Sequence, residues 1–421
     1  MFYELYCPPF RPSPADIQLA LVNLKQLVFE VTDACNLRCK YCVYGDLYTG
    51  YDQRQSQNLP FEDAKAVINY LVDLWKNHSA LAMKSGVSIG FFGGEPLMNV
   101  PLIRQVISYF NELDSPKKVN YNMTSNCLLL DRYMDLLVEN DFSLLCSLDG
   151  DWQADAYRVF PDGTPSFDKV YNNIKLLQHR YPDYFERKVE FNAVLHNLNN
   201  VQGVVDFFRK EFNKLPQIAE MNLSGIRNEQ ESNFEQLFRN MRQDIQETDN
   251  NARLKEALDT SDPEVNELMY YLKNNTGNSF RTYQALFSSD TEESWIQTGT
   301  CLPFTRKMFV KVDGKIMQCE RIHHNFAIGL VRDGQIHLDY NEICNIFNGY
   351  LNKILPLCVA CANRKICSKC LFTVDGIEGG HFKCNSFVTP NEYKEIESRR
   401  LLYLYGHPYL YRKLLCDTVL Y

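Results

Sequence analysis

The sequence lacks the features of a membrane or exported protein. It has no run of about 18 apolar residues, the length that a membrane-spanning helix needs. Its first residues, MFYELYCPPFRPSP, contain no basic stretch followed by an apolar core, so we expect no secretory signal peptide and a cytoplasmic location. An excess of basic charge is also missing, because 44 Lys and Arg stand against 52 Asp and Glu. These absences argue against a membrane partner and against strong binding to nucleic acid.

Cysteine, in contrast, is abundant, with 15 in 421 residues. Without an export signal these residues are better interpreted as metal ligands or redox groups than as a disulfide framework. One group lies near residue 40 and a second lies between 301 and 384, whereas only Cys127 and Cys146 occur between Cys42 and Cys301. The distribution predicts a metal site near the start of the chain and a separate metal-rich module behind it.

The segment from about residue 25 to 225 alternates β-rich runs with amphipathic helical patterns. The predicted strands are 26–32, 87–92, 119–124, 143–148, 189–195 and 219–223. Repeated β-α units require a mainly parallel sheet with right-handed crossovers, which gives an open α/β sheet or a partial barrel. In such folds ligands bind at the carboxyl ends of the strands.

The rest of the chain follows other patterns. Residues 228–300 are polar, acidic and helical, and they are interpreted as a bridge or insertion. Residues 301–384 predict few long helices, so metal rather than a large apolar core is expected to hold them together. The tail, 390–421, predicts a helix whose tyrosines, among them Tyr403, Tyr405, Tyr409 and Tyr411, serve mainly for packing.

Three cysteines directly follow the first predicted strand. Cys35, Cys39 and Cys42 have the spacing C-x3-C-x2-C. Three thiolates on one tight loop can hold three irons of a [4Fe–4S] cube and leave the fourth iron open for another ligand. The alternative is a zinc site that takes one ligand from elsewhere.

This loop, with Tyr41 before the third cysteine, resembles the signature of radical S-adenosylmethionine (SAM) enzymes. Later turns agree with this resemblance, namely a Gly-Gly-Glu-Pro turn after the second strand and a Ser-x-Asp-Gly turn after the fourth. Cys127 departs from the family, which usually has Gly there, and a surface arginine is the ordinary alternative for Arg158. By resemblance, the residues that contact SAM are Gly93, Gly94, Glu95, Ser125, Asn126, Ser147, Asp149 and Arg158.

The second group of cysteines resembles the SPASM module, which holds two auxiliary [4Fe–4S] clusters. Two residues separate Cys367 from Cys370, where the family usually has three, and a zinc ribbon is the alternative. By resemblance the outer cluster is bound by Cys358, Cys361, Cys367 and Cys384, and the inner one by Cys301, Cys319 and Cys370. For the inner cluster, the fourth ligand is either Cys344 or a substrate thiol, and Cys344 can equally be an ordinary buried cysteine.

The resemblance implies an α/β fold with a partial (β/α)6 TIM-like barrel of the radical SAM type, followed by the SPASM domain. The expected division is an N-terminal extension at 1–25, the barrel at 26–227, the helical bridge at 228–300, the SPASM domain at 301–385 and the tail at 386–421.

The implied function is modification of a ribosomally made precursor peptide. The likeness is to maturases tied to double-glycine leader peptides, with SAM and three [4Fe–4S] clusters as cofactors and a flavodoxin- or ferredoxin-type electron donor. Hydrogen abstraction by a 5′-deoxyadenosyl radical would then lead to an oxidative C–S or C–C cross-link. The alternatives are a radical SAM peptide epimerase, with Cys127 or Cys146 as hydrogen donor, a sulfatase-type protein maturase, and a zinc-dependent adaptor without enzymatic activity. No catalytic base is assigned.

Overall fold

The computed structural model describes residues 11–79, 86–249, 251–275 and 298–414. The chain divides into two compact units. The barrel unit comprises Ser13–Asn251 and Leu302–Ile343, and the cysteine-rich unit comprises Met1–Pro12, Ala252–Cys301 and Cys344–Tyr421. Among the helices described, none combines the length and the apolar character that crossing a bilayer requires.

A single sheet organises the barrel unit. Its strands are β1 (Gln26–Thr32), β2 (Val87–Gly93), β3 (Val119–Ser125), β4 (Ser143–Ser147), β5 (Val189–Leu195), β6 (Gln217–Glu220), β7 (Lys307–Val310), β8 (Lys315–Met317), β9 (Gly329–Arg332) and β10 (Gln335–His337). They form ten strands in the order β10-β9-β8-β7-β1-β2-β3-β4-β5-β6. Neighbours from β7 through β6 are parallel, whereas β7 to β10 form antiparallel pairs. The sheet therefore has the parallel β-α-β part that the sequence predicts, extended by a small antiparallel part.

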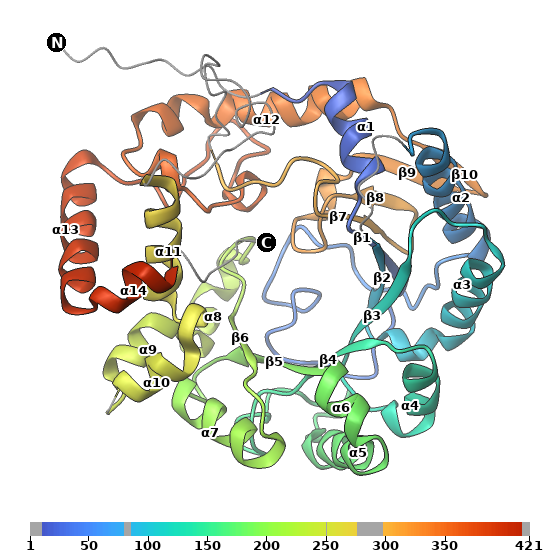
Figure 1. The fold of residues 1–421 in the computed structure, drawn as a ribbon, viewed down its shortest axis with the longest axis horizontal. Coiled ribbons are helices and arrows are strands. Elements are labelled where there is room, and N and C mark those ends of the chain that lie inside the picture. Colours follow the sequence, from blue (N-terminus) through green and yellow to red (C-terminus); the bar gives the residue numbers. More distant parts are fainter. Residues whose placement is uncertain (1–10, 80–85, 250, 276–297, 415–421) are drawn as a thin grey trace. The chain divides into compact units, whose positions relative to one another are not determined.

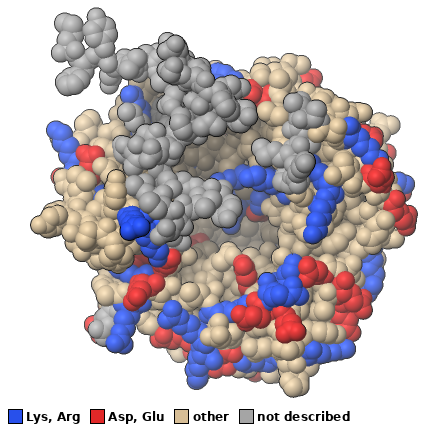
Figure 2. All heavy atoms as spheres, viewed as in Figure 1, with Lys and Arg blue, Asp and Glu red and all other residues tan. Residues whose placement is uncertain are grey.

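Helices cover the outer side of the parallel strands (Figure 1). They include α1 (Pro14–Val22), α2 (Phe61–Asn77), α3 (Val100–Glu112), α4 (Leu130–Glu139), α5 (Phe167–Arg180), α6 (Pro182–Lys188), α7 (Val201–Phe212), α8 (Glu231–Leu237) and α9 (Met241–Glu247). Helix α2 buries the apolar face that its 3.6-residue period predicts, with Val67, Leu71 and Trp75 fully or nearly fully buried. On the face drawn in Figure 2, basic and acidic side chains are interspersed around the lower part of this unit.

Most of the predicted strands are confirmed within one residue, since β-rich runs alternate with clear helical periods. The strand predicted at 219–223 is the exception, because β6 spans Gln217–Glu220. Its register pairs Leu195 with Glu220, so pairing with β5 rather than local composition sets where β6 lies.

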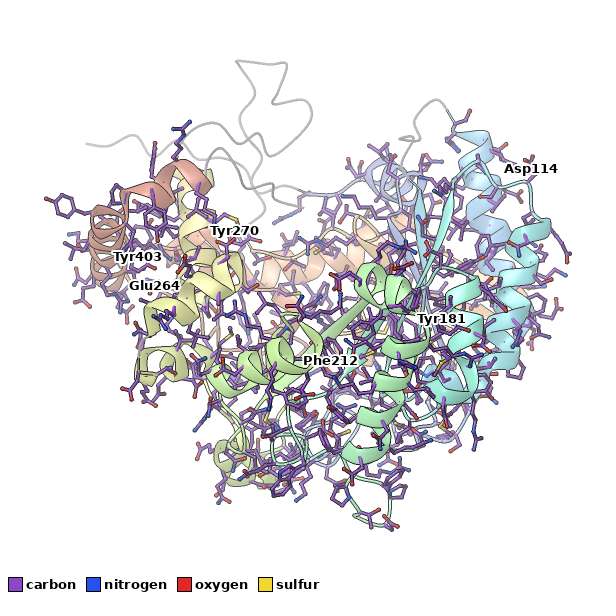
Figure 3. The ribbon with its side chains drawn as sticks, turned by 60° about the horizontal axis from the view of Figure 1, so that its bottom comes forward. Asp114, Tyr181, Phe212, Glu264, Tyr270 and Tyr403 are labelled. Atoms are coloured by element: carbon purple, nitrogen blue, oxygen red, sulfur yellow. The ribbon has the colours of Figure 1, made fainter. Side chains whose placement is uncertain are left out.

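The cysteine-rich unit contains more helix than the sequence suggests. Its helices are α10 (Asn251–Leu258), α11 (Pro263–Asn275), α12 (Tyr340–Ala360), α13 (Pro390–Gly406) and α14 (Pro408–Arg412), of which α10 and α12 begin in the barrel unit. Few long helices were predicted between 301 and 384, and the described structure has one there, α12, which has 21 residues and continues through Pro356. Figure 3 shows Tyr403 of α13 beside Glu264 of α11.

The expected packing role of the tail tyrosines is also wrong for three of them. Tyr405, Tyr409 and Tyr411 are 88%, 66% and 51% exposed. Tyr403 does pack, against an apolar cluster that Leu268 and Leu410 help to form. Tyr421 lies outside the described residues.

The compact units do not end where the sequence-based domain boundaries were placed. Residues 302–343 were expected in the SPASM domain but belong to the barrel unit, because β7 pairs with β1. The assignment of functions to the five predicted segments stays a prediction.

Candidate active site and cluster sites

The three cysteines of the first motif lie on an irregular loop that leaves the carboxyl end of β1. Cys35, Cys39 and Cys42 are free thiols of intermediate exposure. Burial raises the pKa of the Cys39 thiol to about 12, and the negative charges of Cys42 and Cys35 act in the same direction. Burial also raises the pKa of the Cys35 thiol, so cluster binding must release protons from Cys35 and Cys39.

The turn after β2 lies directly against this loop. Gly94 N donates to Thr32 O over 2.9 Å, and Glu95 N donates to Ala34 O over 2.9 Å. A Cβ atom on Gly93 would lie 2.0 Å from Thr32 O, and one on Gly94 would lie 2.1 Å from Ala34 O. Both glycines are therefore required for the close approach of the two segments.

Glu95 connects the β2 turn to the turn after β3. Its carboxylate accepts hydrogen bonds from Ser125 Oγ (2.8 Å), Asn126 N (2.7 Å) and Leu97 N (3.1 Å). Burial raises the pKa of Glu95, although these donors favour the charged form. Two predicted SAM-binding segments are thus joined by one buried carboxyl group.

Cys127 shows how the chain accommodates its departure from the family pattern. Its φ of +63° is the left-handed conformation that glycine adopts easily, so the cysteine takes over the backbone geometry of the missing glycine. Its side chain and that of Cys146 are fully buried, and Cys127 Sγ contacts Ser125 O at 3.6 Å.

The turn after β4 holds a buried polar network. Asp149 is fully buried and accepts hydrogen bonds from the Tyr41 hydroxyl and, over 2.9 Å, from Val194 N. Arg158 donates to the Tyr41 hydroxyl over 3.0 Å, and its Nε lies 3.7 Å from Asp155 Oδ1. Arg158 is thus a buried member of this network rather than a surface residue. Ser147 lies beside it, as the last residue of β4.

Two residues of this region were not singled out from the sequence. His196 follows β5 directly, is fully buried, and places Nε2 3.7 Å from Asp149 Oδ2. Its ring stacks on Tyr41 at a centroid distance of 5.8 Å. Its position at the carboxyl end of a strand was the available signal. Arg54 is the second residue, and no motif marks it.

The barrel unit contains a half-open polar cavity of about 340 Å³. Its lining includes residues at the amino-terminal ends of the strands, namely Gln26, Glu190, Gln217 and Lys307, and also Asn122 and Thr124 of β3. Lys307 forms an ion pair with Glu320 over 2.9 Å within this lining. Neither Cys127 nor Cys146 is among the lining residues.

The four cysteines predicted for the outer cluster come together in the cysteine-rich unit. Cys358, Cys361, Cys367 and Cys384 line one cavity. Burial raises the pKa of Cys358 to about 12, and the charges of the other three thiols contribute. Four thiols around one cavity match the ligand set of a [4Fe–4S] cluster.

The predicted inner set is divided between the two units. Cys301 and Cys370 belong to the cysteine-rich unit, and the charge of Cys301 raises the pKa of Cys370 after the larger effect of burial. Cys319 follows β8 in the barrel unit. Cys344 is buried in α12. The joint role of these residues stays a prediction. In the described parts of the chain, no three His, Cys, Asp or Glu side chains are grouped closely enough for a single metal ion.

The residues present at the carboxyl ends of β1 to β4 fit a SAM-binding [4Fe–4S] cluster. Three free thiols share one loop, and the glycine turn approaches that loop with no room for a side chain. The buried Nε of Arg158 has no hydrogen-bond partner among the described atoms, so a donor is left for a further group. Such an arrangement can hold a cluster through three irons and an additional ligand at the fourth.

Known proteins with related sequences agree with this interpretation. A radical SAM cyclopropyl synthase, TigE, of Paramaledivibacter caminithermalis is 24% identical over 45% of this chain and 44% of its own length. A cysteine-type anaerobic sulfatase-maturating enzyme of Clostridium novyi is 26% identical over 46% of this chain and 48% of its own length. The chain thus spans about half the length of these curated relatives.

The fold is shared with a solved structure, native anSMEcpe with bound AdoMet. The TM-score is 0.62 at 17% identity, and the match covers 94% of this chain and 100% of that one. In addition, residues 29–210 match the profile of the radical SAM superfamily. The chain therefore contains a radical SAM domain, over residues 29–210, and is related to radical SAM maturases.

Proposed function

We propose that this chain is a radical SAM enzyme that modifies a ribosomally made precursor peptide by forming an oxidative C–S or C–C cross-link. The observation that carries the proposal is the convergence of the cysteine loop with the turns after β2, β3 and β4. These segments are joined through Glu95, Asn126 and Asp149 on the strands that line the polar cavity.

The chain's own residues have separate tasks in this proposal. Cys35, Cys39 and Cys42 hold the cluster, and the turns at Gly94 and Asp149 position SAM. Bound together, cluster and SAM supply a 5′-deoxyadenosyl radical that removes a hydrogen atom from an unactivated carbon. We place the peptide in the polar cavity, with its reacting carbon directed toward the carboxyl ends of the strands, where the cofactor is bound.

A peptide substrate fits the chemistry of the cavity. Amide, hydroxyl and charged side chains line it, such as Asn122, Thr124 and Gln217, and these groups can pair with peptide N–H and C=O groups. A related structure, at TM-score 0.59 and 17% identity, is of anSMEcpe with bound AdoMet and a peptide. We extend peptide binding to this chain by analogy.

The distribution of cysteines favours oxidation over epimerisation. Epimerisation needs a hydrogen donor at the substrate, but Cys127 and Cys146 are fully buried and do not line the cavity. Cysteines 358, 361, 367 and 384 surround a cavity that suits an auxiliary cluster, which would accept the electron that the substrate radical releases.

Coexpression with a short peptide encoded beside the gene tests the proposal. A cross-link makes the peptide two hydrogens, about 2 Da, lighter, with one 5′-deoxyadenosine formed per bond. The variant in which Cys35, Cys39 and Cys42 are all Ala should leave the peptide mass unchanged and form no 5′-deoxyadenosine.

Epimerisation gives a different result. The peptide mass would stay constant in water and rise by about 1 Da in deuterated solvent, because a solvent-exchangeable hydrogen replaces the abstracted one. That outcome, abolished by Cys127→Ala or Cys146→Ala, would replace the cross-linking proposal. Modification of a folded sulfatase instead of a short peptide would identify the chain as a sulfatase-type maturase.

A further inference from the structure

Arg54 lies in the segment between the cysteine loop and α2 and contacts a predicted cluster ligand. Its Nη2 donates to Cys42 Sγ over 3.5 Å. The guanidinium carbon lies 4.6 Å from the centroid of the Tyr44 ring, and this contact restricts the direction of the side chain. Arg54 is therefore held against the loop by two independent contacts.

Arg54 is half-buried beside the cysteine loop, so water screens its positive charge only partly. The Nε atom is buried without a hydrogen-bond partner among the described atoms, so one donor of Arg54 remains available.

The carboxylates of Asp52 and Glu30, near Arg54 in the barrel unit, are paired with other groups. Asp52, two residues before Arg54, pairs with Lys311 and Lys315. Glu30 accepts from Tyr44 over 3.1 Å and from Val312 N over 3.1 Å. The positive charge of Arg54 is thus directed at the cysteine sulfurs.

We propose that Arg54 is a positioning residue that raises the reduction potential of the cluster bound by Cys35, Cys39 and Cys42. The inference rests on the proposed assignment of that cluster, and it adds a residue outside every motif. Reduction brings in one electron from the flavodoxin- or ferredoxin-type donor and so adds one negative charge beside the guanidinium. A half-buried cation stabilises this reduced form because solvent screens it only partly.

A redox titration of the full-length, anaerobically reconstituted protein, followed by electron paramagnetic resonance, tests the inference. Addition of SAM identifies the signal of the cluster in question. At a fixed potential, Arg54→Gln should lower the ratio of reduced to oxidised cluster about tenfold, which is 59 mV for one electron. Arg54→Lys keeps the charge and should change the ratio less than threefold.

Arg38 provides the matched control. It is a cation on the same loop, but it is exposed and donates to the carbonyl oxygens of Cys35 and Leu37. Arg38→Gln should leave the ratio unchanged, since water screens an exposed charge. An equal shift in Arg38→Gln and Arg54→Gln, or no shift in Arg54→Gln, would overturn the inference.

The Lys variant decides the matter if Arg54→Gln binds no cluster. A tenfold shift in Arg54→Lys would then contradict a role for the charge. The potential is measured without peptide, so a failure of the cross-linking proposal leaves this result unaffected. If the reconstituted wild-type protein shows no cluster signal that responds to SAM, the assignment of the cluster to Cys35, Cys39 and Cys42 is itself refuted.

Discussion

The side-chain amide of Asn126 donates a hydrogen bond to Asn36 Oδ1 over 2.8 Å. This bond joins the turn after β3 to the cysteine loop after β1, while the backbone N–H of Asn126 donates to Glu95 of the turn after β2. Three segments distant in sequence are therefore connected through one asparagine. The relationship explains why an asparagine is suited to this turn, since its side chain both donates and accepts.

Replacing Asn126 with Ala should weaken SAM binding about fivefold and leave the iron content unchanged. The variant loses the bond to Asn36 that joins the turn to the cysteine loop, and one such bond contributes about 1 kcal/mol. Equilibrium binding of SAM to the anaerobic protein is the measurement. Asn36→Ala should give a similar loss, and the double variant should lose less than the sum. Additive losses would show that the bond does not couple the two segments.

A methyl group at Gly94 should disrupt the site. Its Cβ would lie 2.1 Å from Ala34 O and 2.6 Å from Asp33 O, so the cysteine loop must move. Gly94→Ala should thus reduce SAM cleavage at least a hundredfold, measured as 5′-deoxyadenosine formation. Gly163→Ala is the control, because Gly163 has φ +88° but no atom within 4 Å of its added Cβ, and a cost of only about 1 kcal/mol is expected there. Near-normal cleavage by Gly94→Ala would contradict the required close approach.

The parts of the fold that the sequence reveals are those with strong local patterns. Strands β1 and β5 match the predicted ranges because long β-rich runs precede and follow clear helical periods. Strands β7 to β10 have three or four residues each, too few for a period to be recognised. Pairing with β1 defines β7, and antiparallel pairing with the preceding strand defines each of β8, β9 and β10. The sequence did not predict helix α12, because the density of cysteines between 301 and 384 indicated a segment held together by metal.

The residues of the candidate site likewise fall into those that the sequence predicts and those that it does not. Fixed spacing predicts the cysteine ligands, which stay a prediction, and the Gly-Gly-Glu-Pro turn, which the structure places against the cysteine loop. His196 and Arg54 carry no spacing signal, since their roles depend on contacts with Asp149 and Cys42 that only the folded chain creates. Contacts of this kind are long-range in sequence and cannot be found from periodicity.

Cys361→Ala should remove about four irons and destabilise the cysteine-rich unit, because cluster binding energy is also folding energy. Iron analysis and limited proteolysis of the reconstituted protein measure the two effects. Cys344→Ala is the comparison, and unchanged iron content there would identify Cys344 as an ordinary buried residue of α12. A colourless wild-type protein that contains zinc and no iron would establish the zinc-adaptor alternative.

His324 should make the folded protein sensitive to mild acid. Its side chain is 1% exposed and contacts Asp52 Oδ2 at 3.0 Å. Burial and, next, the charge of Lys311 lower the pKa of His324 from 6.5 to about 4, although Asp52 acts in the opposite direction. Tyr44 and Tyr51 pack against its ring and help to bury the imidazole.

The lowered pKa of His324 determines in which direction the stability of the folded protein changes with pH. Between pH 6.5 and 4 the unfolded state binds a proton that the folded state does not, so stability falls as pH falls through this window. From pH 7.5 to 5.5 the loss should be about 1 kcal/mol, and Asp52 adds little because it is ionised in both states over that range. Thermal unfolding of wild type and His324→Asn at the two pH values measures the effect, and acid loss of clusters affects both proteins alike. The variant should lose less stability than wild type, whereas an equal loss in the two proteins would show that His324 is not buried in its neutral form.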